Sequence, residues 1–261
     1  MIQAAAAGPG PGAGREPDAA LRGEVAGAAN VLARLGLVTA YGHVSARAGE
    51  SMLITPAADL AGVTASGVIE MPLAAGALSA GTLPAGAPAE AWAHLALYRA
   101  RPDAAAIARA QPPGAFAVAA AVTMMVPLHG QAAWLGEQVP VYDDAALLRS
   151  PDQAERAARC LPAGEALLLR GNGAVTLGAS PGLAVARMWL LATACDVYLA
   201  ALAASGAGPV TPLSAGEIAS WRAVGGELLP RLWQHLRSRP GASGSAGCSG
   251  LSGPGPGEEQ G

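Results

Sequence analysis

Apolar positions along the middle of this chain follow two periods in turn, one typical of helices and one typical of strands. Residues 18–35 place their apolar side chains on one stripe of a helix, and Gly36 follows as a stop signal. Farther along, short apolar runs flank turns such as Gly171-Asn172-Gly173, which is typical of paired strands. Helices on both sides of such strands predict an α/β domain with three layers.

The same pattern gives bounds for each element. We expect helices over 18–35, 89–100, 114–122, 152–160 and 213–236, the last one broken near 225–226, and a long helix capped by Ser180. We expect strands over 44–47, 52–55, 104–110, 139–141, 166–170 and 174–177, with a further strand pair within 64–74.

The two ends of the chain differ from its middle. Residues 1–16 are rich in Ala, Gly and Pro without a period, and residues 239–261 are rich in Gly, Ser and Pro. Segments of this composition do not bury enough apolar surface to order themselves. We therefore expect disordered tails at 1–16 and 239–261 and one folded domain over 17–238.

Charge excludes several classes of function. The net charge is −3, and no basic block occurs in the 261 residues, so we expect neither a nucleic-acid partner nor a membrane partner. The sequence also contains no lysine. Schiff-base aldolases, pyridoxal phosphate enzymes and Walker-type phosphate loops all require a lysine amine and are therefore excluded.

Cysteine usage and the N-terminus favour a cytoplasmic protein. The three cysteines share no metal-ligand or redox spacing, and an odd, sparse count suits a reducing compartment. The N-terminus lacks a basic region followed by an apolar run, so we expect no signal peptide. The most apolar helix, near 183–205, carries Arg187 and Asp196, so we expect it to be buried rather than to span a membrane.

Four motifs occur in order between residues 20 and 200. They are Gly42-His43-Val44-Ser45-Ala46-Arg47, Leu53-Ile54-Thr55-Pro56, Pro88-Ala89-Glu90 with His94 and Arg101-Pro102-Asp103 after it, and Leu169-Arg170-Gly171-Asn172-Gly173. In this order and spacing they resemble the class II aldolase/adducin family. The resemblance implies a three-layer α/β/α class II aldolase-like fold with a central mixed or antiparallel sheet. It also implies a homo-oligomer, because the family assembles as tetramers with the cleft near a subunit contact.

The chain departs from the family at the metal position. The family holds a divalent metal with three histidines, and the matching positions here are Arg109, Gln111 and Asn172. A guanidinium does not ligate a cation, and amides are poor zinc ligands. We expect no metal at this inherited three-histidine position. A divalent metal at a rebuilt site, made by His43, His94 or His129 with Glu90, stays open.

Polar replacements in so apolar a chain favour a changed function over drift of an inactive site. Arg109 would hold an anionic oxygen, and Gln111 and Asn172 would orient the substrate. Glu90 resembles the family's proton-transfer carboxylate, and the loop residue His129 is a second candidate for the proton transfer. These five residues form the candidate catalytic set. His94, one helical turn after Glu90, is expected to be a packed core residue.

The substrate-binding turn is the second place where the resemblance is informative. By resemblance, the substrate-binding residues are Gly42, His43, Ser45 and Thr55. The family's phosphate-binding hydroxyls are replaced by Ala57-Ala58 and Pro88-Ala89, so phosphate donors are lost. We therefore expect a small unphosphorylated carboxylate as the substrate.

These groups suit a carbon–carbon lyase that stabilises a carbanion or enolate. The family includes decarboxylases of hydroxylated aromatic acids and of ring-cleavage products, so a decarboxylase of such an acid, in aromatic catabolism, is the expected function. Two alternatives stay open. One is a metal-dependent aldolase-type lyase with a rebuilt site. The other is a non-catalytic binding module, as in adducin.

The first prediction concerns metal content. At about 4 Å and an effective dielectric near 20, a divalent ion and a guanidinium repel by roughly 8 kcal/mol. The purified protein should therefore carry no stoichiometric divalent metal at Arg109, Gln111 and Asn172, as measured by elemental analysis, and chelator should leave its activity intact. The triple variant R109H/Q111H/N172H should bind metal but lose the native activity. Stoichiometric native metal, with activity lost to chelator and restored by metal, would contradict this prediction.

Overall fold

The computed structural model describes residues 15–74, 76, 78, 82–206 and 208–239, so the expected tails fall almost entirely outside the described residues. The helices are α1 (Arg15–Arg34), α2 (Ala91–Ala100), α3 (Pro113–Ala121), α4 (Pro151–Arg159), α5 (Pro181–Ala204) and α6 (Ala215–Ser238). The strands are β1 (His43–Ala48), β2 (Ser51–Ile54), β3 (Ile69–Pro72), β4 (Ala106–Ala110), β5 (Met124–Met125), β6 (Val139–Tyr142), β7 (Ala166–Leu169) and β8 (Gly173–Gly178).

The strands form a single mixed sheet in the order β3-β2-β1-β4-β8-β7-β6-β5. The pair β6–β7 is parallel, and the other neighbouring pairs are antiparallel. Because successive side chains of a strand point to opposite faces, each central strand contributes to two cores. In β4, for example, Ala106, Ala108 and Ala110 face one core, and Ile107 faces the other.

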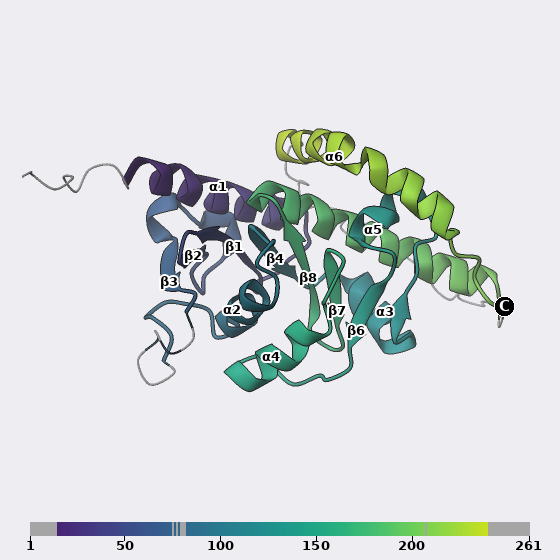
Figure 1. Ribbon diagram of the computed structural model, residues 1–261, viewed down its shortest axis with the longest axis horizontal. Helices are drawn as coiled ribbons and strands as arrows, with labels where there is room; N and C mark the ends of the chain where they lie inside the picture. The colour runs from purple at the N-terminus through teal and green to yellow at the C-terminus, as the bar shows by residue number, and fades with distance from the viewer. Residues whose placement is uncertain (1–14, 75, 77, 79–81, 207, 240–261) are drawn as a thin grey trace, which may run out of the picture.

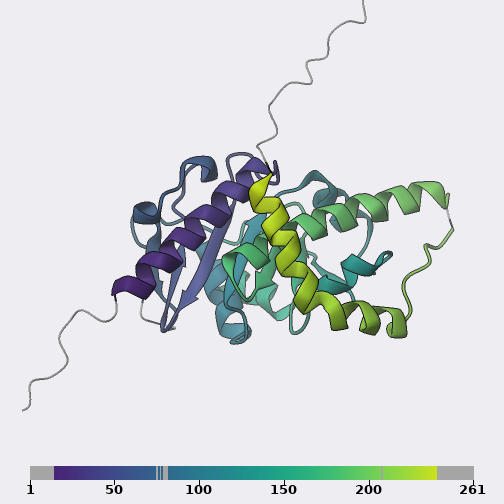
Figure 2. The same cartoon turned by 90° about the horizontal axis from the view of Figure 1, so that it is seen from above.

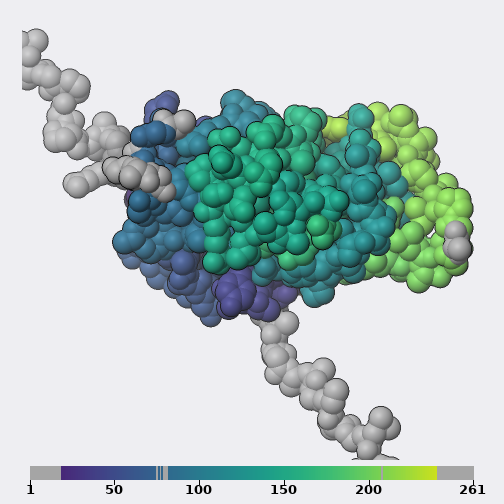
Figure 3. Space-filling model, turned by 90° about the horizontal axis from the view of Figure 1, so that it is seen from below, coloured from purple at the N-terminus to yellow at the C-terminus, as the bar shows by residue number. Residues whose placement is uncertain are grey.

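Helices cover both faces of this sheet, as the sequence predicts (Figure 1). Helices α1, α3 and α5 pack on one face, and α2 and α4 pack together on the other, which is the face seen in Figure 3. Helix α6 lies across the outside of α1 and α5 (Figure 2). Its C-terminal end is tied to α1 by Arg34, which donates to the carbonyl oxygens of Leu236 (3.3 Å) and Arg237 (2.9 Å).

Helix α5 is long and apolar enough to cross a membrane by length and composition. In the fold it packs against β4 and β8 on one side and against α1, α3 and α6 on the others. Its apolar composition therefore matches its place at the centre of the domain, as expected from the sequence. Ser180 caps it, because its hydroxyl oxygen accepts the Leu183 amide at 3.3 Å.

The structure corrects three expectations about secondary structure. The break expected near 225–226 is wrong, since α6 runs without interruption and Gly225 lets the Trp134 ring lie 3.0 Å from where its Cβ would be. Residues 64–74 form one strand, β3, rather than a pair. The two-residue strand β5 and the 3₁₀ helix Gly130–Leu135 were not predicted, because both are too short to show a period.

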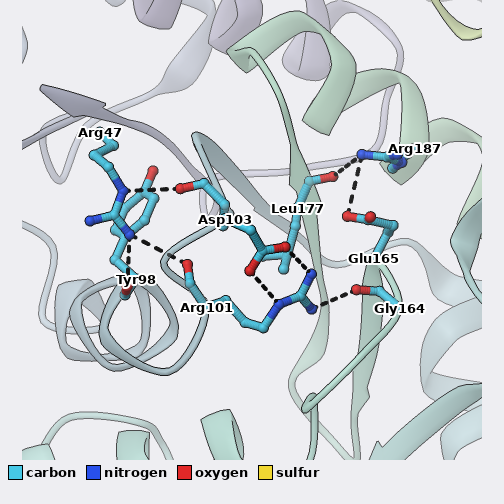
Figure 4. A network of polar contacts seen from close by, with 9 residues as sticks. Arg47, Tyr98, Arg101, Asp103, Gly164, Glu165, Leu177 and Arg187 are labelled. Atoms are coloured by element: carbon cyan, nitrogen blue, oxygen red, sulfur yellow. Dashed lines mark hydrogen bonds and ion pairs between the residues drawn. The ribbon is translucent and has the colours of Figure 1, made fainter. Parts of the chain in front are cut away.

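A network of arginines closes the edge of the sheet where β4 begins (Figure 4). Arg101 donates to both carboxylate oxygens of Asp103, at 2.8 and 2.6 Å, and to the Gly164 carbonyl oxygen at 2.7 Å. Arg187 donates to the Leu177 carbonyl oxygen at 2.9 Å and pairs with Glu165. These bonds satisfy the Gly164 and Leu177 carbonyl oxygens at this edge.

The second prediction tests the close approach of β8 to α5. A Cβ on Gly178 would lie 2.4 Å from the Ala184 nitrogen, whereas a Cβ on Gly27 in α1 would meet nothing within 4 Å. Gly178→Ala should lower the free energy of unfolding by about 2 kcal/mol because backbone has to move. Gly27→Ala should raise it by about 0.5 to 1 kcal/mol. Urea unfolding measures both, and a neutral Gly178→Ala would contradict this packing.

Candidate active site

The edge of the sheet at the end of β4 collects the functional residues. In the antiparallel ladder, His43 at the start of β1 lies opposite Arg109 near the end of β4. On the other side of β4, Arg109 lies opposite Val175, close to the start of β8. Antiparallel neighbours bring a strand start beside a strand end, so residues far apart in sequence meet here.

Arg109 is the centre of this edge. Its side chain lies on the same face of β4 as Ile107, toward α2, and the residue is 3% exposed. Its Nη2 donates to the Asn172 carbonyl oxygen at 3.2 Å and, through a shorter bond, to the Asn172 side-chain oxygen. Because a guanidinium only donates, the amide of Asn172 must turn its oxygen toward Arg109. Its Nδ2 is then left as a donor, buried and without a partner among the described residues.

Two glycines permit this close approach. A Cβ on Gly173 would lie 2.2 Å from the Ala110 carbonyl oxygen, and Gly173 also has a φ of +83°. The turn before β8 can therefore bring Asn172 against the end of β4. Gly42 plays the same role for β1, since its Cβ would lie 3.2 Å from the Arg109 carbonyl oxygen.

Two buried histidines lie beside Arg109. The rings of His43 and His94 meet edge to face with centroids 5.7 Å apart. His94 Nδ1 is 2.7 Å from the Ser45 hydroxyl, which is 2.9 Å from the Tyr98 hydroxyl. The expectation that His94 is a packed core residue is thus confirmed. One nitrogen of each ring, His43 Nδ1 and His94 Nε2, is buried without a partner in the described part of the chain.

Burial keeps both histidines neutral. It is the main cause that lowers the pKa of His94 to about 3, and the charge of Arg109 lowers it further. Burial likewise lowers the pKa of His43 well below its usual range, with smaller contributions from His94 and Arg109. The buried Tyr98 has a raised pKa because of desolvation. Arg109 is therefore the cationic group at the base of this site.

A cleft of about 580 Å³ opens above these groups. Its base is formed by residues predicted from the sequence, and its walls are largely apolar or small. The lining residues are Ala40, Tyr41, Gly42, His43, Ala57, Ala58, Asp59, Pro88, Ala89, Glu90, Arg109, Gln111, Leu147, Arg149 and Asn172.

Two of the lining residues form an ion pair. Arg149, in the loop before α4, donates through Nε to Glu90 Oε1 at 3.2 Å. The Glu90 side chain is 13% exposed and stands at the N-terminal cap position of α2, where it makes no cap hydrogen bond. Burial has the largest effect on the pKa of Arg109 and lowers it. The charge of Glu90 raises this pKa, and the charge of Arg149 lowers it. The charges of Glu90 and Arg149 thus both influence Arg109.

The residues present do not fit a divalent metal at the inherited position. A buried guanidinium bound to Asn172 fills that place, and it offers no lone pair. A rebuilt site with His43 and His94 meets the same charge, and His94 Nδ1 already bonds to Ser45. No group of three or more His, Cys, Asp or Glu side chains able to hold a metal occurs among the described residues.

The structure brings together most, but not all, of the residues predicted from the sequence. Glu90, Arg109, Gln111, Asn172, Gly42 and His43 line the cleft. Ser45 and Thr55 are fully buried and support the strands instead; Thr55 Oγ1 accepts the Val44 amide at 3.2 Å. His129 does not line the cleft of its own chain. It precedes the 3₁₀ helix that packs against α5 and α6, in the opposite layer.

Sequence reasoning missed Arg149. It directly precedes Ser150-Pro151, a helix-start signal, and nothing in that local pattern shows that the loop reaches α2. Tyr41, which is 66% exposed at the cleft, was also missed, although its place before the Gly42-His43 motif could have indicated it.

The third prediction follows from the neutral histidines. Below pH 6.5 the unfolded chain binds a proton at His94 that the folded chain does not bind, so stability present at pH 7 is lost as the pH falls. From pH 7 to pH 5 this loss should reach about 2 kcal/mol for His94 alone. His94→Gln should flatten the pH dependence of the unfolding free energy, and the exposed-site control His235→Gln should not. Equal slopes in the wild type and His94→Gln would contradict this assignment.

Two curated proteins are similar to part of this chain. The chain is 35% identical over 118 residues to a 4-hydroxy-3-prenylphenylpyruvate oxygenase/4-hydroxy-3-prenylbenzoate synthase from Streptomyces roseochromogenus subsp. oscitans. The aligned segment covers 45% of this chain and 43% of the relative. It is 31% identical over 172 residues to alpha-adducin from Rattus norvegicus, covering 64% of this chain and 23% of that protein. The chain thus spans less than half the length of these curated relatives.

Solved structures show the same fold. An l-fuculose-1-phosphate aldolase from Thermus thermophilus is 26% identical, with a TM-score of 0.63 over 74% of this chain and 99% of that one. An aldolase II superfamily protein from Pseudomonas syringae superposes with a TM-score of 0.68 at 22% identity, over 85% and 92% of the two chains. The family model described as Class II Aldolase and Adducin N-terminal domain matches residues 23–199. This chain therefore belongs to the class II aldolase/adducin family.

Proposed function

We propose that this protein is a carbon–carbon lyase that decarboxylates a small unphosphorylated carboxylic acid, aromatic or derived from ring cleavage, through a carbanion or enolate. One observation carries the proposal. The guanidinium of Arg109 lies in a cleft of about 580 Å³ that Glu90 also lines, and the family resemblance assigns a metal ligand to the position of Arg109. A fixed cation that is already oriented stabilises charge that develops in a transition state.

Asn172 orients this cation. Its two oxygens hold Arg109 in place, so little rearrangement is needed when an anionic oxygen forms. The unpartnered Nδ2 of Asn172 supplies a further donor, and Gln111 lines the same cleft. Arg109, Asn172 and Gln111 thus provide several donors for one developing oxyanion or carboxylate.

The walls of the cleft support an unphosphorylated substrate with an apolar body. Ala57, Ala58 and Ala89 line the cleft and carry no hydroxyl, and Tyr41 and Leu147 add apolar surface. The relative from Streptomyces bears a name that refers to a substituted phenylpyruvate and a benzoate, both aromatic carboxylic acids. An aromatic acid fits such a lining better than a sugar phosphate does.

The reaction balances with residues of this chain. The bond between the carboxylate and its neighbouring carbon breaks, and carbon dioxide leaves. The bonding electrons pass into an enolate oxygen held by Arg109, so the substrate carries a carbonyl group β to the carboxylate that leaves. Glu90 then delivers a proton to the carbon and regains one from solvent, so the net change consumes one proton. His129 could serve this step only if a second copy of the chain brought it to the cleft.

The assembly and location remain part of the proposal. We propose a homo-oligomer, a tetramer by family resemblance, in the cytoplasm, with a small carboxylate as its substrate and no nucleic-acid or membrane partner. Exposed apolar side chains on α5 and α6, namely Val197, Trp221 and Val224, are consistent with a subunit contact.

The fourth prediction tests the proposed reaction. Purified protein with excess chelator should release carbon dioxide from at least one acid in a panel of aroylacetates, hydroxybenzoates and hydroxylated phthalates, whose carbonyl or phenol oxygen can accept the bonding electrons, followed by ¹³C NMR. Glu90→Gln should lower turnover by about 100-fold or more while still binding the acid. Arg109→Met should lower it by at least about 100-fold and should also weaken binding.

Arg170→Gln is the matched control, because Arg170 forms an exposed ion pair with Asp143 near the cleft and does not line it. Its turnover should equal that of the wild type. Full turnover in Glu90→Gln, or turnover that requires added metal, would contradict the mechanism. Binding of acids without turnover in any variant would favour the second candidate, a non-catalytic module, for which the alpha-adducin similarity is the supporting observation.

A further inference from the structure

Arg149 is a charged residue that lines the cleft and takes no part in the proposed proton transfer. It belongs to the loop between β6 and α4, which ends where Ser150 caps α4 by accepting the Gln153 amide at 3.4 Å. Its side chain is 56% exposed, whereas Arg109 is almost fully buried. The cleft therefore offers one guanidinium at its base and a second one at its mouth.

Other charged residues near this loop pair within the loop or with its neighbours. Asp143 pairs with Arg170, and Asp144 pairs with Arg156 at 3.7 Å, on exposed surfaces. Arg149 differs because its partner, Glu90, stands at the N-terminal cap position of another helix, α2, and is mostly shielded from solvent. An ion pair of this kind places a cation where a ligand would enter.

The partner of Arg149 is also the proposed proton carrier. While Glu90 accepts from Arg149, its carboxylate is engaged, which hinders its delivery of a proton to a substrate carbon. Asp59, the other acid that lines the cleft, is used elsewhere, since its Oδ1 accepts the Ala61 amide at 3.0 Å. A ligand that replaces Glu90 on Arg149 would therefore free Glu90 for proton transfer.

We infer that Arg149 is a specificity-determining residue that binds a second carboxylate of the substrate. The inference rests on the proposed function, in which Arg109 holds the reacting end. The substrate class is then a dianionic acid, with its reacting carboxylate or enolate at the base of the cleft and its other carboxylate at the mouth. That second carboxylate takes the Glu90 oxygen's place on the Arg149 guanidinium, which suits bidentate carboxylate binding.

Ligand pairs that differ by one carboxylate test the inference. Calorimetry would measure the binding of unbranched dicarboxylates from malonate to adipate, each beside the monocarboxylate of equal carbon number. For the chain length that fits the cleft best, the wild type should bind the dicarboxylate about tenfold or more tightly than the monocarboxylate of equal carbon number. Arg149→Gln should reduce this preference to about twofold or less and leave monocarboxylate binding unchanged. Arg170→Gln should keep the full preference.

Glu90→Gln gives a change of opposite sign. Removing the competing carboxylate frees Arg149, so this variant should bind the dicarboxylate several-fold more tightly than the wild type, by about the worth of one charged hydrogen bond. If the Arg149–Glu90 pair only supports the structure, Arg149→Gln and Glu90→Gln should each bind both the dicarboxylate and the monocarboxylate more weakly than the wild type does.

The outcomes separate this inference from the proposed function. An unchanged preference in Arg149→Gln would overturn the inference. If Arg109→Met then still loses monocarboxylate binding, the proposed function stands. Circular dichroism would check that Arg109→Met is folded, and Arg109→Lys would replace it if it is not. A wild-type protein that binds neither ligand of any pair would overturn both.

Discussion

A guanidinium buried inside an apolar sheet has to be solvated by the protein, and Asn172 solvates Arg109 with two oxygens. This requirement sets the local geometry. The turn before β8 has to reach the end of β4, which Gly173 permits because a Cβ there would collide with the Ala110 carbonyl oxygen. Burial, with a smaller contribution from the same charge, lowers the pKa of both neighbouring histidines, so the base of the cleft has one permanent cation and neutral surroundings.

Arginine side chains have different roles at the two ends of β4. Where β4 begins, Arg101 and Arg187 donate to backbone oxygens and to Asp103 and Glu165, and the edge is closed. Where β4 ends, the donors of Arg109 are only partly used, and a cleft remains open above them. In a chain without lysine, every permanent side-chain cation is a planar fork of donors, which favours oriented binding of carboxylates.

The two arginines of the cleft lie at different depths. Arg109 lies at the base with its orientation set by Asn172, and Arg149 lies at the mouth on a loop, with Glu90 as its partner. The alanines that line the walls leave room but provide no hydroxyl donors. Affinity for the body of a ligand then comes from apolar contact, and its charged groups determine its direction in the cleft.

The order of residues alone was enough to predict the α/β layering, the positions of most elements, and the candidates Arg109, Gln111 and Asn172, which line one cleft. These features are local, because periodicity, turn residues and motif spacing depend on neighbouring positions.

Other features became visible only in the folded chain. Arg149 contacts Glu90, which is 59 residues away in sequence. Ser45 and Thr55 face the interior, and His129 lies in the opposite layer. The folded chain also shows that α6 continues through Gly225, beside which the Trp134 ring packs 3.0 Å from where a Cβ would be. Such contacts depend on which faces of distant elements pack together, and local sequence patterns carry no record of that.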